Sequence, residues 1–530
     1  MSSFSVKNIA KFAAVAVAAA FAMSSISVAN AEEPTATPQP ELTTMASPIS
    51  KGSVGLQMFG YNWNSIAREC TTTLGPEGVD WVLTMAPTDH IKGNQWWIHY
   101  QPTSYELNSD AGTREEFAAM VKACNTAGVK IVTDAVVNHM AGGSGTSFSG
   151  IPYGADLNFA GIYKSENFHR GLPTTSPNFC DKDIVDWDTL WERTNCQFPG
   201  LPDLATEQPY VREQIAKYLN DQLSLGVSGF RIDAAKHMHP DDIAAIRGLL
   251  TNPNAFIVQE VPGGTDLANE YTPNGSVWAW DVPALTLEMF SYAGKAHRAK
   301  LYDNIDTPDF PNTDLAITWV SNHDTEHHAS GSLTYDNGRM FELANIWLLS
   351  EKYGTPMLYT GYAFSNGDLQ APQDANGKIK DAVCAGGTKI NTVAKQPTVG
   401  NYKTGSFVCL QRWTSIKGMI AWRDTVGEAA KTNMYAPKAG TTNSGVYAFG
   451  RSGLGYVAIN SKASAVKLTG VATGMKAGTY CDLISGGNKP VKVKGKSCVG
   501  TQIVIDKAGK VTASIAAQTA FAISTTSKLK

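Results

Sequence analysis

Short β-like runs alternate with helix-like stretches along this chain from Lys51 to about Asp424. The clearest strands are predicted at residues 54–59, 81–86, 130–137, 229–234, 256–260 and 317–321, and amphipathic helices at 114–127, 211–225 and 340–352. Alternation over so long a stretch indicates a parallel sheet closed by helices, and its length favours an α/β fold of the (β/α)8 TIM-barrel type. A doubly wound open sheet is the alternative, but no Gly-x-Gly-x-x-Gly turn follows the first strand.

Two parts of the chain depart from this alternation. After His139, a Gly/Ser-rich stretch opens a segment without helical period that extends to Gly200. Because a structureless loop of that length is unusual, we predict a subdomain at 140–200, inserted after the third strand of the barrel at 51–430. From residue 431 to 530, short alternating runs separated by turn residues predict a C-terminal all-β sandwich. These runs lie at 445–449, 456–459, 501–505 and 520–523.

The N-terminus is typical of an exported protein. Lys7 and Lys11 precede the apolar run 12–23, and Ala29-Asn30-Ala31 has the small-x-small pattern of a cleavage site, so residues 1–31 are predicted to be a signal peptide. The alternative is a membrane anchor, but the run is shorter than the roughly 20 residues that span a bilayer. Residues 32–50 are rich in Pro and Thr and are predicted to be a flexible leader. We therefore expect a secreted, extracellular protein with no membrane partner.

The cysteines agree with export. All eight follow residue 31, and an even number fits disulfides formed in an oxidising compartment. They are Cys70, Cys124, Cys180, Cys196, Cys384, Cys409, Cys481 and Cys498. Zinc is the alternative use, but no Cys-x-x-Cys pair supports it. Pairing neighbours along the chain is the simplest connectivity, with Cys180 and Cys196 closing the insert, and the sequence alone leaves the pairing open.

The composition excludes some classes of partner. The chain of 530 residues is 43% hydrophobic, which is too apolar for a disordered protein. Lys and Arg number 44 against 47 Asp and Glu, which gives a net charge of −3. Since no excess of positive charge is present to neutralise phosphates, a nucleic-acid partner is not expected. A monomer is the default expectation.

Three carboxylates stand at the ends of predicted strands, where the active site of a (β/α)8 barrel forms. Arg231 and Asp233 share one face of their strand, and the guanidinium favours the ionised form that a nucleophile needs. Glu260 follows an apolar run, which would raise its pKa and suit it to deliver a proton. Asp324 shares a face with Asn322 at the end of a third strand. Each acid alone is more often a helix cap or a salt-bridge partner, but together they form a specific set.

A fourth segment places Asp134, Val136 and Asn138 on one face and ends where the insert begins. The alternative is that Asp134 and Asn138 only satisfy buried backbone groups.

Four segments resemble the signature segments of the α-amylases, glycoside hydrolase family 13, in order and spacing. These are DAVVNH (134–139), GFRIDAAKH (229–237), the glutamate at 260 after an apolar strand, and VSNHD (320–324). A fifth segment, LPDLA (201–205), also matches, and the aromatic run at 96–101 and the cysteine layout look like the animal and actinobacterial secreted branch.

The resemblance implies hydrolysis of α-1,4-glucosidic bonds in starch, glycogen and maltooligosaccharides with retention of configuration, which needs two carboxyls roughly 5 Å apart. It implies that Asp233 is the nucleophile, Glu260 the general acid/base and Asp324 a stabiliser of the transition state. His139 and His323 would donate hydrogen bonds to the sugar, although a lone histidine is more often a core residue. An α-glucan transferase, which uses the same acids, and a catalytically dead glucan-binding protein are the alternatives.

Sugar rings also need flat apolar faces. Trp96, Trp97 and Tyr100 form an aromatic cluster with Gln101 as a polar partner. A core cluster is the alternative, but adjacent tryptophans cannot both point inward from an extended segment, so Trp97 and Tyr100 are expected to be exposed. Lys236 and His237 follow the nucleophile and are predicted to line the leaving-group side.

The family also carries a structural calcium between barrel and insert. Calcium prefers six to eight oxygen ligands. By resemblance, Asn138 and Asp203 would supply side-chain ligands, and His237 and Thr194 backbone carbonyls.

Chloride-activated relatives hold the anion with an arginine, an asparagine and a further cationic side chain. Arg231 and Asn322 match the first two, but the third position falls on Met357, which cannot hold an anion, so chloride is not expected.

Overall fold

The computed structural model describes residues 49–50, 52–291, 314–329, 331–384, 402–437, 445–492 and 495–530. The predicted signal peptide and nearly all of the predicted leader lie outside the described residues. Within those ranges, no helix combines the length and the apolar character needed to cross a membrane. The part of the chain from Ser47 to Lys530 forms one compact unit.

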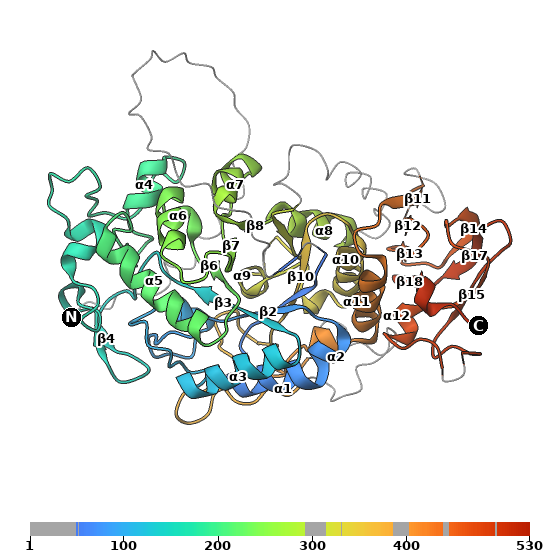
Figure 1. The fold of residues 1–530 in the computed structure, drawn as a ribbon, viewed down its shortest axis with the longest axis horizontal. Coiled ribbons are helices and arrows are strands. Elements are labelled where there is room, and N and C mark those ends of the chain that lie inside the picture. The colour runs from blue at the N-terminus through green and yellow to red at the C-terminus, as the bar shows by residue number, and fades with distance from the viewer. Residues whose placement is uncertain are drawn as a thin grey trace, which may run out of the picture. The chain divides into compact units, whose positions relative to one another are not determined.

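Eight parallel strands close into a barrel in the order β1-β10-β9-β8-β7-β6-β3-β2 (Figure 1). The strands are β1 Gly55–Met58, β2 Trp81–Thr84, β3 Lys130–Ala135, β6 Gly229–Ile232, β7 Phe256–Gln259, β8 Ser276–Trp278, β9 Ala316–Thr318 and β10 Thr355–Thr360. The predicted TIM barrel is confirmed. Two of its strands, β8 and β10, were not among the clearest sequence predictions, and β8 is only three residues long.

The barrel interior is filled with large apolar side chains because strands of a parallel barrel are buried on both faces. This cluster contains Trp81, Leu83, Val132, Phe256, Val258, Trp278, Ile317, Trp319 and Met357. At Gly55 a side chain could not be accommodated, since a Cβ atom there would lie 2.2 Å from the ring of Trp81. A glycine in β1 therefore makes room for the tryptophan of the neighbouring strand.

Helices follow the strands and cover the barrel. They are α1 Trp63–Glu69, α2 Gly75–Glu77, α3 Arg114–Thr126, α5 Pro209–Ser224, α6 Pro240–Gly248, α7 Thr265–Tyr271, α8 Asp281–Ser291, α9 His323–His327, α10 Arg339–Ser350 and α11 Thr414–Val426. Helix α3 begins with a capping box, in which the Thr113 side chain accepts from the Glu116 N–H and the Glu116 carboxylate accepts from the Thr113 N–H. The predicted helices at 114–127, 211–225 and 340–352 correspond to α3, α5 and α10 within two residues at each end.

The segment between β3 and α5 contains little regular structure. It holds the short strands β4 Gly145–Thr146 and β5 Pro152–Tyr153 and the helix α4 Leu190–Asn195. A disulfide joins Cys180 to Cys196, and the other three bonds also join neighbouring cysteines, at 70–124, 384–409 and 481–498. The simplest pairing is therefore the one observed.

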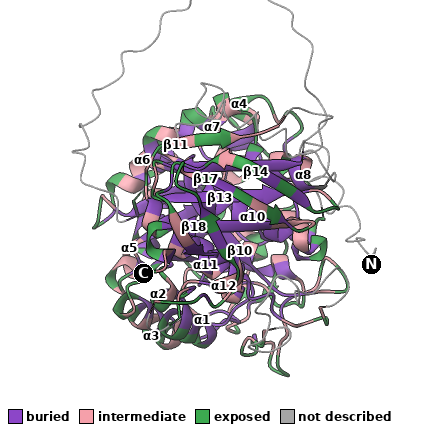
Figure 2. Ribbon diagram, turned by 90° about the vertical axis from the view of Figure 1, so that its right-hand side faces the viewer, coloured by how far each residue is buried: buried purple, intermediate pink, exposed green. Residues whose placement is uncertain are grey.

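Two antiparallel sheets form the C-terminal part, in the strand orders β11-β12-β13-β18 and β14-β17-β16-β15. Their elements are β11 Lys431–Tyr435, β12 Val446–Arg451, β13 Gly455–Asn460, β14 Val466–Ala472, β15 Gly478–Cys481, α12 Leu483–Gly486, β16 Gln502–Ile505, β17 Lys510–Ile515 and β18 Thr519–Ser524. Buried residues (purple) are concentrated in β13 and β18 in Figure 2. The all-β prediction is confirmed, and Arg451 links this part to the barrel by donating to the Ser350 carbonyl at 2.9 Å.

Candidate active site

Arg231 in β6 stands at the centre of a buried cluster of carboxylates. Its Nη1 lies 2.7 Å from both oxygens of Asp134 and 2.8 Å from Oδ1 of Asp233. Its Nη2 lies 2.8 Å from Oε2 of Glu260. One guanidinium with no solvent exposure thus contacts carboxylates from the ends of three strands. The ring of Trp278 lies 4.5 Å from the guanidinium carbon and supplies a cation–π contact.

The sheet register brings these groups together. Asp134 in β3 is the cross-strand partner of Arg231 in β6. Asp233 continues β6, with its N–H donating to the Ala135 carbonyl at 3.1 Å, and Glu260 continues β7, with its N–H donating to the Ile232 carbonyl at 3.0 Å. Parallel strands in a closed barrel place successive strand ends at one mouth. Residues far apart in sequence therefore meet there.

The Glu260 carboxyl does not lie in the apolar surroundings that its strand suggested. Besides Arg231, its Oε2 accepts from the N–H of Ala234 at 2.9 Å. Ala234 has a left-handed backbone, with φ of 49°, which is rare for a residue other than glycine. The strained turn after β6 thus aims a backbone donor at the glutamate. The apolar run precedes the acid but does not surround it.

Asp233 and Asp324 also differ from isolated aspartates. Burial raises the pKa of Asp233 well above its usual range; Arg231 opposes this, while Glu260 and Asp134 add to it. The sequence predicted only the effect of the arginine, because the neighbouring carboxyls belong to other strands. Burial and the charge of Glu260 raise the pKa of Asp324 to about 7. All of these carboxyls are close enough to influence one another.

Two histidines border the acids as neutral imidazoles. Burial lowers the pKa of His139 to about 4 and that of His323 well below its usual value. His323 Nδ1 lies 2.9 Å from the Gln57 amide nitrogen, so it accepts this hydrogen bond, and its Nε2 faces Asp324 Oδ2 at 3.4 Å. His139 has protein partners at both nitrogens: the Tyr100 carbonyl at 3.0 Å and Asn138 Oδ1 at 3.1 Å.

The aromatic segment is a 3-10 helix, Trp96–Tyr100, rather than the extended strand assumed from sequence. Trp96 is 5% exposed and stacks on His327 with centroids 4.9 Å apart, so it supports the site from within the core. Trp97 and Tyr100 are partly exposed. The Tyr100 hydroxyl donates to Asp134 at 2.9 Å, and its ring stacks on His323 at 5.0 Å.

The remaining predicted contacts lie on either side of the acids. Gln101 Oε1 accepts from the Gly142 N–H at 3.1 Å, at the start of the insert. Lys236 Nζ lies 3.3 Å from the Pro262 carbonyl and 5.8 Å from the ring centroid of Trp187. The insert thus contributes an aromatic side chain beside Lys236.

Four residues predicted as calcium ligands are buried, and three of them meet. The Asn138 amide nitrogen donates to Asp203 Oδ1 at 2.9 Å and to the His237 carbonyl at 3.0 Å. Thr194 is near them, because His237 Nδ1 donates to the carbonyl of the preceding Arg193 at 3.1 Å. An amide can turn over to present its oxygen. With the amide turned over, the ligand atoms of Asn138, Asp203 and His237 would all be oxygens, which calcium prefers.

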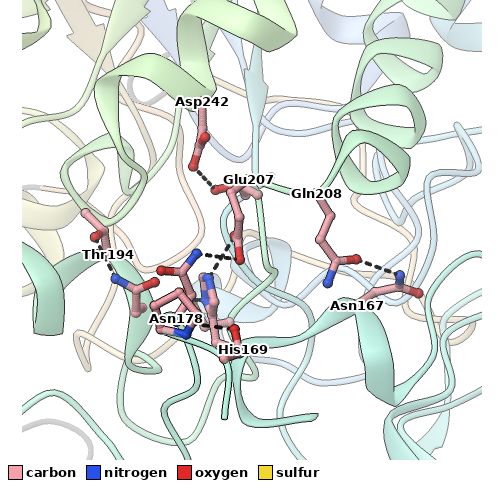
Figure 3. A network of polar contacts seen from close by, with 12 residues as sticks. Asn167, His169, Asn178, Thr194, Glu207, Gln208 and Asp242 are labelled. Carbon is pink, nitrogen blue, oxygen red and sulfur yellow. Dashed lines mark hydrogen bonds and ion pairs between the residues drawn. The ribbon is translucent and has the colours of Figure 1, made fainter. Parts of the chain in front are cut away.

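A further polar network lies behind this set (Figure 3). His169 Nδ1 is 2.6 Å from Asp203 Oδ2, and its Nε2 is 3.0 Å from a carboxylate oxygen of Glu207, toward which Asn178 also points. Burial alone would lower the pKa of His169, but hydrogen bonds to the two carboxylates raise it to about 9. His169 was not predicted, since nothing in its own segment reveals Asp203 as its partner.

Comparison with known proteins decides the family. Residues 92–398 match "Alpha amylase, catalytic domain" and residues 439–526 match "Alpha amylase, C-terminal all-beta domain". The chain is 35% identical to the alpha-amylase of Streptomyces violaceus over 90% of its own length and 75% of that protein. It is 34% identical to pancreatic alpha-amylase 2a5 of Mus musculus, with 87% and 91% covered. The chain belongs to the α-amylase family.

Solved α-amylases have the same architecture. The structure matches a maltohexaose complex of a variant of alpha-amylase I from Eisenia fetida with a TM-score of 0.75, 28% identity and coverage of 89% of this chain and 97% of that one. The wild-type Eisenia fetida enzyme matches with a TM-score of 0.76 and 27% identity, with 90% and 98% covered. The chain is thus a glycoside hydrolase of this family.

Some residues around these acids were missed by the sequence analysis or left without a role. Asp134 was placed on one face of its segment with Val136 and Asn138, but the contact of both its oxygens with Arg231 Nη1 depends on the register of β3 and β6. Trp278 ends the three-residue strand β8, which has no charged residue, and Gln57 lies within β1. Trp187 belongs to the insert, where no periodicity indicated which side chains reach the barrel.

Proposed function

We propose that this chain is a secreted, calcium-dependent α-amylase that cuts internal α-1,4 bonds of starch, glycogen and maltooligosaccharides with retention of configuration. The observation that carries the proposal is the pair of contacts from Arg231, at 2.8 Å to Asp233 and 2.8 Å to Glu260. A single guanidinium can touch two carboxyls only when they lie close together, as retaining hydrolysis requires. The maltohexaose complex of the Eisenia fetida relative supports an oligosaccharide substrate.

In this proposal Asp233 attacks C1 of the sugar and Glu260 protonates the departing glycosidic oxygen, which leaves a glycosyl-enzyme ester. Glu260 then takes a proton from water, which displaces Asp233 and retains the configuration. The first step requires a proton on Glu260 and none on Asp233. A coupled group of carboxyls around one guanidinium can share protons in this way. Asp324 would hold sugar hydroxyls as positive charge develops on the ring.

The surrounding residues would position the glucan. Trp97 and Tyr100, both partly exposed, offer faces for stacking on sugar rings. His323 would donate from Nε2, since its Nδ1 already accepts from Gln57. A neutral His139 has a single N–H, so it would need to redirect this donor from its present protein partner to the sugar. Gln101, Lys236 and His237 complete the predicted contacts.

Calcium fits the set formed by Asn138, Asp203 and the carbonyls of His237 and Thr194, because the first three already converge within hydrogen-bond distance. These residues come from the ends of β3 and β6 and from the insert. A bound calcium would supply structural cross-linking there, which holds the strand that carries Asp233. For chloride, Arg231 Nε and Asn322 Nδ2 are buried donors without a hydrogen-bond partner among the described residues. The third position is Met357, so chloride is not part of the proposal.

Starch hydrolysis by purified variants tests the assignment. Asp233→Asn and Glu260→Gln should each lower the release of reducing ends by at least about a thousandfold, while Asp266→Asn, at an exposed aspartate in α7, should leave it unchanged. The first product of the wild type should be the α-anomer by NMR. A rise in reducing ends excludes transfer as the main reaction. If the wild type bound starch but released no product, it would be a glucan-binding protein without catalytic activity.

Export is tested separately, by expressing the full chain with its N-terminus intact. The four disulfides of the structure support an oxidising compartment. N-terminal sequencing of the protein in the medium should begin after Ala31. Retention of the full-length chain inside the cell would contradict secretion.

A further inference from the structure

Three buried side chains outside the carboxylate cluster converge in the segment that joins β2 to α3. They are His90, His99 and Asp110, which are 0%, 1% and 1% exposed. The two imidazole rings are 4.8 Å apart and roughly perpendicular, with an interplanar angle of 62°. Buried polar groups normally have hydrogen-bond partners. Atoms of this cluster that lack one therefore indicate what the cluster could bind.

The hydrogen bonds leave acceptor atoms facing one another. His90 Nδ1 lies 2.7 Å from the Ile91 carbonyl and must donate to it, so Nε2 carries the lone pair. That nitrogen is 3.4 Å from Asp110 Oδ1 and has one long contact, at 3.3 Å, from the Asp110 N–H. Asp110 Oδ1 accepts no hydrogen bond, and His99 Nδ1, which is 3.6 Å from the same oxygen, also has no hydrogen-bond partner. A lone pair and a carboxylate oxygen facing one another in the core call for a cation between them.

Two glutamines hold the outer atoms of the same side chains. Asp110 Oδ2 accepts from the Gln370 amide at 2.9 Å and from the Gln373 amide at 3.3 Å. The Gln370 amide also lies 2.7 Å from His99 Nε2. In this arrangement His99 Nε2 accepts from Gln370, so Nδ1 carries the proton. Metal binding at Nδ1 would require this proton to move to Nε2 and the Gln370 amide to turn over, which would leave Gln373 as the amide donor to Asp110 Oδ2. Such outer hydrogen bonds are typical of histidines and carboxylates that bind metals.

We propose that His90 Nε2, His99 Nδ1 and Asp110 Oδ1 bind a divalent transition-metal ion of the zinc class. Two imidazoles and one carboxylate are a donor set that zinc prefers and calcium does not. Ligand atoms around a tetrahedral zinc stand about 3.4 Å apart, and the contacts of 3.4 and 3.6 Å to Asp110 are near this value. All three ligand atoms lie within 4.8 Å of one another. The fourth position would take water.

A metal ion would have to displace any proton from the three ligand atoms. The rival occupant is a proton on His90, which Asp110 would attract. A proton on His90 Nε2, however, would point at the Asp110 N–H that now donates to this nitrogen.

A metal at this site would stabilise the aromatic segment, because one of its ligands belongs to that segment. His99 belongs to the 3-10 helix Trp96–Tyr100, and the Trp96 N–H donates to the Asp368 carbonyl at 3.1 Å. The ring of Phe148, in the insert, stacks on His90 at 5.5 Å. A metal ion would therefore join three points of the connection between β2 and α3, next to the proposed sugar-binding surface. This inference does not depend on the proposed function, since it concerns metal binding alone.

Cobalt uptake by the full-length chain tests the site. Protein stripped with a chelator and resupplied with calcium is titrated with Co2+, whose visible absorption reports tetrahedral nitrogen and oxygen ligands. We expect one equivalent to bind in the wild type and Zn2+ to displace it. His99→Gln and Asp110→Asn should abolish the absorption and the zinc-dependent rise in Tm. His239→Asn should retain both, because His239 is a half-exposed helix cap whose role asparagine can fill.

Two results would overturn the inference. Absence of stoichiometric cobalt binding in the wild type would mean that the cluster holds a proton only. Equal cobalt binding in the wild type and in folded His99→Gln would place the metal elsewhere. Circular dichroism of each variant shows whether it is folded, and a variant that fails to fold leaves the wild-type titration as the deciding measurement.

Discussion

Arg231 Nη2 and Glu260 Oε2 lie 2.8 Å apart, although the two residues belong to different strands. The same guanidinium contacts Asp134 and Asp233 through Nη1. The arginine thus fixes the distance between the proposed nucleophile and the proposed acid. Its positive charge also neutralises part of the negative charge of the buried carboxylates around it.

Replacement of Arg231 should therefore damage both activity and stability. In Arg231→Lys, one ammonium cannot reach three carboxyls in the geometry of a planar guanidinium, so the acids lose their alignment. We expect kcat on soluble starch to fall by about 100-fold or more and Tm to decrease. Arg412→Lys is the matched control, because Arg412 pairs with Glu69 away from the cluster. Equal losses in the two variants would show that Arg231 acts only on stability.

Much of the fold and the acids could be predicted because local pattern determines them. The strand before Asp233 alternates as a strand must, and the apolar run before Glu260 is buried on both faces in β7. A closed barrel then places strand ends at one mouth whatever the details. The disulfide of Cys180 and Cys196 follows from proximity along the chain.

The rest depended on partners that are distant in sequence. The contact of Asp134 with Arg231 requires the register of two strands, and the pKa of Asp233 depends on carboxyls from other strands. The segment of Trp96 and Trp97 was taken as extended, but a 3-10 turn there buries the first ring and leaves the second partly exposed. Tertiary packing decides such local conformations.

Trp97 should contribute to substrate binding rather than to chemistry. Trp97→Ala removes a partly exposed aromatic face, which is worth about 1 kcal/mol, so KM for maltohexaose should rise about fivefold with kcat little changed. Trp97→Phe should recover most of the loss. A fall in kcat at unchanged KM would instead show that Trp97 aligns the acids.

Calcium removal should loosen the connection between insert and barrel. Treatment with EGTA should lower activity and Tm, and added calcium should restore both while zinc should not. Asp203→Asn should weaken calcium binding, measured by calcium content after dialysis. Asp242→Asn is the control, since Asp242 (Figure 3) is a buried acid of the same region, and it pairs with Thr206 and Arg212. Full activity after exhaustive removal of calcium would contradict the proposed site.

Asp324 should make the stability of the protein depend on pH. Its pKa is about 7 in the folded protein and ordinary, about 4, in the unfolded chain, so the folded state holds the proton more tightly. The contribution of this group to the free energy of unfolding is therefore present at low pH and is lost as the pH rises from about 4 to about 7. Asp324→Asn cannot titrate and should lack this loss. Relative to the wild type, its free energy of unfolding should rise by on the order of 2 kcal/mol across that range.

Urea unfolding at about pH 4.5 and about pH 7.5, with saturating calcium, measures this difference. Asp506→Asn serves as the control, because it removes an exposed carboxylate from a turn of the C-terminal part, where no buried proton is involved. Its stability should follow that of the wild type at both pH values. If the curves of Asp324→Asn and the wild type stay parallel, Asp324 is ionised across the whole range. The proton shared among the carboxyls would then reside on Asp134 or Asp233, which burial also favours.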